Sequence, residues 1–271
     1  MGSRHIMKVI SANLNGIRAA AKKGFFDWMD KEQADVICIQ ETKAQAHQLD
    51  DEIFNPKGYY RFLYDAEKKG YSGTAIYSRV EPDQVTKGLG WDIADEEGRY
   101  IQADFGNLSI ASLYLPSGSS KDERQALKME FLEKLNPILN NMVNSDRQYI
   151  LCGDWNIVHK RIDIKNFNGN KKRSGCLPEE RAWLDKVFAE EGVEEPIGMV
   201  DAFRVLNQEA EQYTWWSNRG QAWANNTGWR IDYQIISPTL KSKLLNTSIY
   251  KDERFSDHAP LIMEYDMDLG K

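Results

Sequence analysis

Two polar side chains with catalytic potential follow an apolar segment near the middle of the chain. Residues 149–152 (YILC) are typical of a strand buried on both faces, and Gly153 then leads into Asp154 and Asn156. If the strand continues through them, their side chains point to the same face, because alternate residues of a strand do so. Turn chemistry alone could also place an Asp and an Asn there, and this segment by itself leaves the two interpretations even.

Polar residues of the same small set follow other apolar segments of the chain. An amide, acid, hydroxyl or imidazole stands at the end of each: Asn13 and Asn15, Glu41, Tyr114, Asp232, Asp257 and His258. Each has a structural interpretation when taken alone, such as a turn cap or a paired core carboxylate. Because open α/β sheets place their sites at strand ends, the recurrence favours convergence of these side chains on one site.

These residue types suit the hydrolysis of a phosphoester. Oxygen ligands such as Glu41 suit Mg²⁺ or Mn²⁺, which polarise a phosphoryl oxygen and stabilise the leaving group. A histidine held by a carboxylate can bind a phosphate oxygen or move a proton. The sequence has no Cys/His ligand cluster, no Rossmann glycine pattern and no P-loop, so soft-metal and nucleotide-cofactor chemistry are not indicated.

Apolar runs alternate with helical spacing along the chain, which predicts an α/β fold. Strands are expected at residues 8–12, 34–39, 59–64, 74–78, 99–105, 108–115, 149–152, 200–203, 230–236 and 261–265. Helices are expected at 19–31, 45–53, 121–142 (with a kink or early end at Pro137) and from 177 onward, and a polar loop at 166–176. No linker divides the chain, so residues 7–271 are predicted to form a single domain, and residues 1–6 are interpreted as vector-derived.

Composition indicates a globular protein with no strong preference for a partner. The 271 residues are 41% hydrophobic and 28% charged, and no apolar run approaches the length of a membrane span. The net charge of -6 argues weakly against a nucleic-acid partner, although a local basic surface and a metal ion could offset it. The cysteines Cys38, Cys152 and Cys176 lack paired spacing, which favours buried thiols, a reducing compartment and hence a cytoplasmic location.

Short motifs distributed from end to end make the chain recognisable. In order they are SANLNGIRAA, CIQETK, SGTAIYS, LYLPSG, LCGDWNI, GWRIDY and FSDHAPL, and they span essentially everything after Met7. Together they resemble the exonuclease III family of abasic-site (AP) endonucleases, within the endonuclease/exonuclease/phosphatase superfamily. The resemblance implies a four-layer α/β sandwich, in which two mixed β-sheets pack face to face with helices on the outside. It also implies a Mg²⁺-dependent DNA repair hydrolase of base excision repair.

Such an enzyme cleaves the phosphodiester 5′ to an abasic site in double-stranded DNA and leaves a 3′-hydroxyl and a 5′-deoxyribose phosphate. Members also show 3′-phosphodiesterase and 3′→5′ exonuclease activity to differing degrees, and Mn²⁺ is expected to substitute for Mg²⁺. The resemblance further implies a monomer that has double-stranded DNA with abasic sites as its partner and does not act at a membrane.

The resemblance implies a role for each matching residue. Glu41 would bind the metal, with Asn13 and Asp257 nearby. Asp154 would orient or deprotonate the attacking water, and Asn156 would hold the scissile phosphate. His258 would contact the phosphate, with Asp232 as its orienting carboxylate. Tyr114 would hydrogen-bond the phosphate or stabilise the leaving group.

DNA contacts are expected from aromatic and basic residues. Trp229 and Trp215 resemble the wall that packs on a flipped-out abasic sugar, whereas Trp216 and Trp223 could be ordinary packing. Asn15 stands where some members carry an Asp, which leaves the charge arrangement there open. Further candidates for phosphate contacts are Arg99, Arg230, Lys43 and the loop Lys171-Lys172-Arg173.

Two other functions share parts of this pattern. A phosphatase or phosphodiesterase of the same superfamily acting on a lipid or inositol headgroup would carry the same Glu, Asp, Asn and His residues. The tryptophan-rich segment before Asp232 and the LYLPSG and QETK contexts favour DNA instead. A binding module that has lost its chemistry would need a broken site, and here the expected residues are all present.

Overall fold

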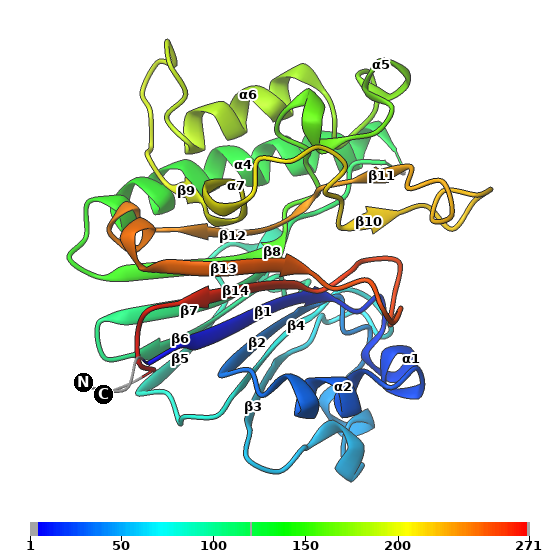
Figure 1. Cartoon of the computed structure of the whole chain (residues 1–271), viewed down its shortest axis with the longest axis vertical. Helices are drawn as coiled ribbons and strands as arrows, with labels where there is room; N and C mark the ends of the chain where they lie inside the picture. Colours follow the sequence, from blue (N-terminus) through cyan, green and yellow to red (C-terminus); the bar gives the residue numbers. More distant parts are fainter. Residues whose placement is uncertain (1–4, 120, 270–271) are drawn as a thin grey trace.

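The computed structural model of the chain describes residues 5–119 and 121–269 and contains two six-stranded β-sheets (Figure 1). The first has the order β13-β14-β1-β2-β4-β3, with bounds β1 Met7–Asn13, β2 Val36–Gln40, β3 Tyr60–Tyr64, β4 Thr74–Ser78, β13 Leu244–Ile249 and β14 Leu261–Tyr265. The second has the order β5-β6-β7-β8-β12-β9, with bounds β5 Gln84–Lys87, β6 Tyr100–Phe105, β7 Leu108–Tyr114, β8 Gln148–Asp154, β9 Val200–Asp201 and β12 Asp232–Ile236. Each sheet is mixed, because β1 is parallel to β2 and β7 to β8 while their other strand pairs are antiparallel.

The helices lie on the outer faces of the two sheets (Figure 1). Against the first sheet, α1 (Ile17–Lys22) and α2 (Phe25–Glu32) pack through an apolar cluster that joins Phe25 to Ile37. Against the second, α4 (Asp122–Val143) and α6 (Pro178–Val187) pack through a cluster that joins Phe131 to Leu151. Shorter helical segments are α3 Asp92–Asp95, α5 Phe167–Asn170, α7 Ala202–Leu206, η1 Ala46–Gln48, η2 Glu52–Phe54, η3 Arg161–Asp163 and η4 Pro238–Lys243.

The inner faces of the sheets share one core. Val9 and Cys38 of the first sheet are buried in the same cluster as Ile110 and Cys152 of the second. Hydrogen bonds also cross between the sheets, since the Gln40 amide donates to Ser112 Oγ at 2.9 Å. The predicted four-layer sandwich is therefore confirmed.

Several boundaries differ from the sequence predictions. The helix expected over 19–31 is two helices, because Gly24 between them takes the left-handed conformation at φ 91°. The helix expected over 45–53 is two 3-10 turns, and α5 occupies part of the predicted loop 166–176. The strand expected over 200–203 ends at Asp201, and α4 runs through Pro137 to Val143.

Residues 1–4 of the segment interpreted as vector-derived lie outside the described part of the chain, whereas His5 and Ile6 are described and exposed. Among residues 5–119 and 121–269, no helix combines the length and the apolar character that crossing a membrane requires.

Candidate active site

Strand register in the second sheet aligns three of the expected site residues. Tyr114 at the end of β7 pairs with Asp154 at the end of β8, and Asp232 at the start of β12 also pairs with Asp154. β7 and β8 are parallel while β12 is antiparallel, so their polar residues meet at one edge of the sheet. The prediction of convergence at strand ends is confirmed for these three positions.

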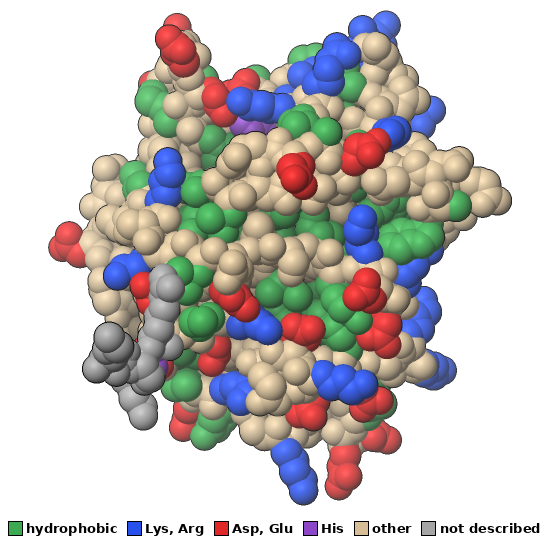
Figure 2. Space-filling view, viewed as in Figure 1, with side chains coloured by type: hydrophobic (Ala, Val, Ile, Leu, Met, Phe, Trp, Pro, Cys, Tyr) green, Lys and Arg blue, Asp and Glu red, His purple; other side chains and the backbone are tan. Residues whose placement is uncertain are grey.

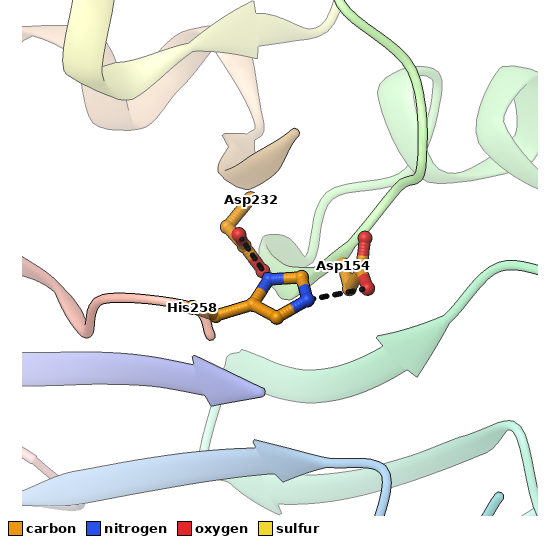
Figure 3. Close-up of side chains that lie close together, drawn as sticks. All are labelled: Asp154, Asp232 and His258. Atoms are coloured by element: carbon orange, nitrogen blue, oxygen red, sulfur yellow. Dashed lines mark hydrogen bonds and ion pairs between the residues drawn. The ribbon is translucent and has the colours of Figure 1, made fainter. Parts of the chain in front are cut away.

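The first sheet contributes the other half of the cluster. Asn13 ends β1, and its amide donates to Asp154 Oδ2 at 2.9 Å across the two sheets. His258 lies in the loop before β14, with Nδ1 2.8 Å from Asp232 Oδ2 and Nε2 3.7 Å from Asp154 Oδ2 (Figure 3). All four side chains are buried, so the imidazole is held between two carboxylates away from solvent.

The buried ionisable groups shift one another's pKa values. Burial would lower the pKa of His258, but the Asp232 and Asp154 carboxylates overcome that effect and raise it to about 10. Burial is also the largest influence on Asp154, and with repulsion from Asp232 and Glu41 it raises the pKa of that carboxyl to about 8 against the attraction of His258. Such strongly perturbed groups, gathered at one edge of a sheet, are typical of a functional site.

The two strand ends use the same local turn. The backbone N–H of Asn156 donates to Asp154 Oδ1 at 2.9 Å, and that of Asn15 donates to Asn13 Oδ1 at 2.9 Å. Asn156 and Asn15 both have positive φ, at 52° and 45°, a region that asparagine tolerates better than most residues. An Asx turn therefore fixes the backbone that follows β1 and the backbone that follows β8.

Oxygen-bearing side chains surround this cluster in a way that fits a divalent cation. Glu41 follows β2 at a positive φ of 58°, and the amide of Asn15 donates to Asp257 Oδ1 at 3.2 Å. The Lys43 ammonium lies 2.6 Å from Asn15 Oδ1 and 3.7 Å from Glu41, so a positive charge is already accommodated among these oxygens. Asp232 Oδ1 is buried without a hydrogen-bond partner among the described residues. Carboxylate and amide oxygens with few soft donors match Mg²⁺ or Mn²⁺.

Arg99 supports Tyr114 instead of facing a DNA phosphate. Its guanidinium is buried, lies 4.7 Å from the centre of the Tyr114 ring and donates to the Tyr114 carbonyl at 3.0 Å. A salt bridge of 2.5 Å to Glu97 occupies the other side of the group, and Arg124 shares Glu97 at 3.2 Å. The prediction that Arg99 contacts DNA is thus corrected, because its donors are taken up inside the protein.

Arg230 is also corrected. Its side chain is 1% exposed and binds Asp163 at 2.7 Å and Asp201 at 2.6 Å, while the guanidinium packs over the Tyr233 ring. The predicted strand over 230–236 begins only at Asp232, so Arg230 lies outside it. Arg230 therefore stabilises the junction of η3, β9 and β12, and its burial keeps the guanidinium away from a phosphate.

Two tryptophans form an aromatic wall beside the cluster. β10 (Trp215–Trp216) pairs with β11 (Gly228–Trp229), and the rings of Trp215 and Trp229 meet edge to face at 5.8 Å. Trp215 Nε1 donates to Asp257 Oδ2 at 3.1 Å, which ties the wall to the His258 loop. Trp216 is buried against Trp223, in agreement with the packing interpretation of that pair.

The expected basic loop is exposed. Lys171, Lys172 and Arg173 follow α5 on the surface. Lysine and arginine side chains gather on the side of the molecule that carries α5, β10 and β11 (Figure 2). A separate cavity of about 590 Å³ lies around η3, β9 and α7, lined in part by His159, Phe188 and Arg204, and includes none of the catalytic residues inferred above.

The sequence reasoning missed a buried ion pair behind Asn156. Lys128 of α4 is 1% exposed, and its ammonium contacts the Asn156 carbonyl at 2.7 Å and the carboxylate of Glu180 in α6. The available signal was the spacing of Lys128 to Phe131, Leu132 and Leu135, which places a lysine on the apolar stripe of α4.

Comparisons with known proteins identify the family of the chain. A family model described as the Endonuclease/Exonuclease/phosphatase family matches residues 10–258. The chain is 40% identical over 259 residues to an exodeoxyribonuclease of Bacillus subtilis (strain 168), a match that covers 94% of this chain and 98% of the relative. It is 34% identical over 264 residues to the DNA repair nuclease APEX1 of Danio rerio, covering 95% of this chain and 81% of that protein.

A solved structure gives the same result at the level of the fold. An AP endonuclease from Archaeoglobus fulgidus superposes with a TM-score of 0.84 at 27% identity and covers 96% of this chain and 100% of its own. The register of Tyr114, Asp154 and Asp232 thus occurs on a fold shared with a known nuclease. The chain belongs to the endonuclease/exonuclease/phosphatase family, on the branch of exodeoxyribonucleases and AP endonucleases.

Proposed function

We propose that this protein is a DNA repair nuclease that hydrolyses the phosphodiester 5′ to abasic sites in double-stranded DNA. The observation that carries the proposal is the buried set Asn13, Asp154, Asp232 and His258, placed directly beside the Trp215–Trp229 wall. The hydrogen-bonded acids and imidazole suit phosphoester hydrolysis, and the aromatic wall suits an extrahelical sugar. The relatives named as exodeoxyribonuclease and DNA repair nuclease support the same activity.

In the proposed reaction, Asp154 accepts a proton from the attacking water. The water oxygen bonds to phosphorus, and the bond from phosphorus to the 3′ oxygen of the upstream nucleotide breaks. That oxygen takes up a proton from solvent and becomes the 3′-hydroxyl, Asp154 returns its proton to solvent, and the phosphate stays on the abasic deoxyribose. Asn156 and His258 bind the phosphate oxygens, and Tyr114 donates to the phosphate or to the departing oxygen.

The protein's own contacts support these roles. Asp232 holds His258 Nδ1, which leaves Nε2 to face Asp154 and a phosphate. The Asn156 amide donates one hydrogen to the Leu115 carbonyl at 2.7 Å, which leaves its second N–H for a ligand. Burial and the neighbouring Glu41 and Asp154 carboxylates raise the pKa of Tyr114 well above its ordinary value, so its hydroxyl remains a donor.

Glu41 would hold Mg²⁺, with Asn13 and Asp257 nearby, and Mn²⁺ would substitute. When bound, such a cation supplies positive charge that polarises a phosphoryl oxygen, stabilises the leaving group and lowers the pKa of Asp154. Lys43 and Asn15, which border the same oxygens, are proposed to contact the DNA backbone there.

The aromatic wall gives the proposed preference for a missing base. Trp215 and Trp229 would pack on the flipped abasic sugar, and a full nucleotide would have to find room for its base as well. Cleavage of 3′ blocking groups and 3′→5′ exonuclease activity would use the same acids.

Further parts of the proposal concern the whole chain. We propose that the protein works as a monomer, because one chain supplies every site residue named above. The shared core between the sheets supports a single domain over residues 7–271. Free, buried Cys38, Cys152 and Cys176 support a reducing, cytoplasmic environment.

The deciding experiment is gel analysis of a labelled duplex that contains one abasic-site analogue, with Mg²⁺ and with EDTA, beside an intact duplex. Cleavage 5′ to the lesion that leaves a 3′-hydroxyl and stops in EDTA is expected. The intact duplex reports exonuclease activity in the same gel. If folded protein cleaves neither duplex with any divalent metal but releases phosphate from an inositol phosphate, the headgroup-phosphatase function replaces this one.

A further inference from the structure

A lysine and a glutamate are paired deep inside the helical layer next to the catalytic strand end. Lys128 of α4 is 1% exposed and Glu180 of α6 is 0% exposed, and their charged groups are in direct contact. Taking two charges out of water is costly, and apolar residues of similar volume often stabilise a protein as well or better. Stability alone is therefore a weak reason for this pair.

Each member of the pair also binds backbone close to the active site. The Lys128 ammonium donates to the Asn156 carbonyl at 2.7 Å. Glu180 Oε1 accepts from the backbone N–H of Gly175 at 2.7 Å and of Leu177 at 3.1 Å. The pair thus links the turn that carries Asn156 to the segment that leads into α6.

The Asn156 carbonyl depends on this outside donor. β8 ends at Asp154, so residue 156 is beyond the sheet ladder, and its φ of 52° turns the backbone away from the strand direction. On another side the carbonyl abuts Gly175, where an added Cβ would lie 3.1 Å from the oxygen and 3.0 Å from Trp229 Cζ3. The turn is therefore enclosed between Lys128 and Gly175, and Gly175 in turn touches the aromatic wall.

We propose that Lys128 is a positioning residue for phosphodiester hydrolysis, which fixes the backbone of Asn156 so that the side-chain amide of Asn156 faces the scissile phosphate. Glu180 contacts the same ammonium, but the group that donates to Asn156 is Lys128 itself. This inference rests on the proposed function, because it assigns Asn156 to the phosphate. A misplacement of about 1 Å at such a group costs on the order of 100-fold in rate.

The test replaces the cation without leaving an unpaired buried charge. In Lys128→Met/Glu180→Gln both charges are removed, and the Gln carbonyl can still accept from Gly175 and Leu177. Glu180→Gln alone keeps the lysine. The matched control is Lys8→Met/Glu32→Gln, a Lys–Glu pair of 3.2 Å at the opposite end of β1 from Asn13.

Single-turnover cleavage of an abasic duplex in Mg²⁺, DNA binding in EDTA and thermal unfolding are measured for each protein. The double variant at 128 and 180 should lose about tenfold to 100-fold in single-turnover rate, with DNA affinity within about threefold of wild type. Glu180→Gln and the control pair should keep most of the rate. Lys128→Leu/Glu180→Gln, with a differently shaped apolar side chain, should show the same loss of rate. It replaces the Met variant in the test if that variant unfolds below the assay temperature.

A rate within about threefold of wild type in either folded double variant would overturn the inference. So would an equal loss in Glu180→Gln alone, because the donor to Asn156 would then not be the cause. Failure of the proposed function is distinguishable, since wild-type protein would then not cleave the abasic duplex at all.

Discussion

At the scale of single residues, the two sheets end in the same turn but carry different charge. Asn13 and Asp154 each accept the N–H of the residue two positions later, at 2.9 Å, so the backbone geometry is matched. Only Asp154 brings a carboxylate, and Asn13 donates to it. The chemical difference between the two strand ends is thus one ionisable group, which identifies Asp154 as the residue to test first.

Replacing Asp154 with Asn should abolish most cleavage while DNA binding persists. The amide keeps the Asx turn but cannot take the proton of water, and loss of a general base costs about 10²–10⁴-fold in rate. Single-turnover cleavage in Mg²⁺ and anisotropy with labelled duplex in EDTA measure the two properties. Asp104→Asn, on β6 where its carboxylate binds Ser109, is the matched control and should cleave normally. Near-normal turnover by Asp154→Asn would remove Asp154 from the role of base.

His258 should remain protonated in metal-free protein well above the ordinary range for histidine. Its pKa is raised to about 10 because the carboxylates of Asp232 and Asp154 outweigh burial. A raised folded pKa means that its stabilising contribution is full below the ordinary value of 6.5 and is lost as pH rises through about 10. Asp232→Asn removes one of these carboxylates, so the imidazole should titrate at lower pH.

NMR of the His258 ring in EDTA, titrated from pH 5 to 11, checks this expectation, with Asp104→Asn again as the control. A wild-type ring that titrates near pH 6.5, or a midpoint unchanged by Asp232→Asn, would show that the carboxylates do not govern its charge.

At the scale of elements, strands were easier to predict than side-chain partners. Apolar runs placed β2, β4, β7 and β8 within a few residues, because a strand buried on both faces must be apolar throughout. The helix over 19–31 was wrong because its apolar spacing continues across Gly24, and only the left-handed φ there separates α1 from α2.

For the site residues as well, the position in a strand could be predicted and the side-chain partner could not. The ends of the apolar runs predicted that Asn13, Tyr114, Asp154 and Asp232 would converge. An arginine, however, has the same appearance in a sequence whether it faces phosphate or a buried acid. Arg230 meets Asp163 from a segment 67 residues away, and no local pattern encodes that contact.

The Asp163 carboxylate should make the junction of η3, β9 and β12 sensitive to acid. Burial would raise its pKa, but the guanidinium of Arg230, followed by that of Arg204, holds it well below its ordinary value of 3.8. A lowered folded pKa contributes stability that is present above pH 3.8 and is lost as pH falls toward the folded pKa. Asp163→Asn removes a carboxylate that pairs with buried Arg230. It should therefore lower the free energy of unfolding by about 3–5 kcal/mol at pH 7.

Urea unfolding at pH 7, 4 and 3 measures both effects. The deficit of Asp163→Asn relative to wild type should shrink as the pH falls below 4, because wild type then begins to lose the same contribution. Asp146→Asn, in the turn before β8, is the control and should stay within about 0.5 kcal/mol of wild type. A deficit that is constant from pH 7 to 3 would contradict the ion-pair account of this junction.

At the scale of the whole molecule, an acidic protein must approach a polyanion. The net charge of -6 is an average, and exposed basic residues lie on the side of the molecule that carries α5, β10 and β11. Local positive charge near the site can steer DNA even where the total charge repels it, and such binding weakens steeply with salt. The basic residues that follow α5 should therefore contribute to DNA affinity without contributing to the rate of cleavage.

Lys171→Ala/Lys172→Ala should weaken DNA binding and also lower the dependence of that binding on salt. Each lysine that neutralises a phosphate contributes about 0.9 to the slope of log affinity against log salt, so the double variant should lose about one to two units of slope. Lys241→Ala/Lys243→Ala, two exposed lysines in η4 at the far ends of the same sheets, is the matched control and should leave the slope unchanged. Anisotropy in EDTA from 50 to 300 mM KCl gives both slopes, and single-turnover cleavage at saturating protein should be the same for all three proteins. Equal slopes for the two double variants would place the DNA path away from α5.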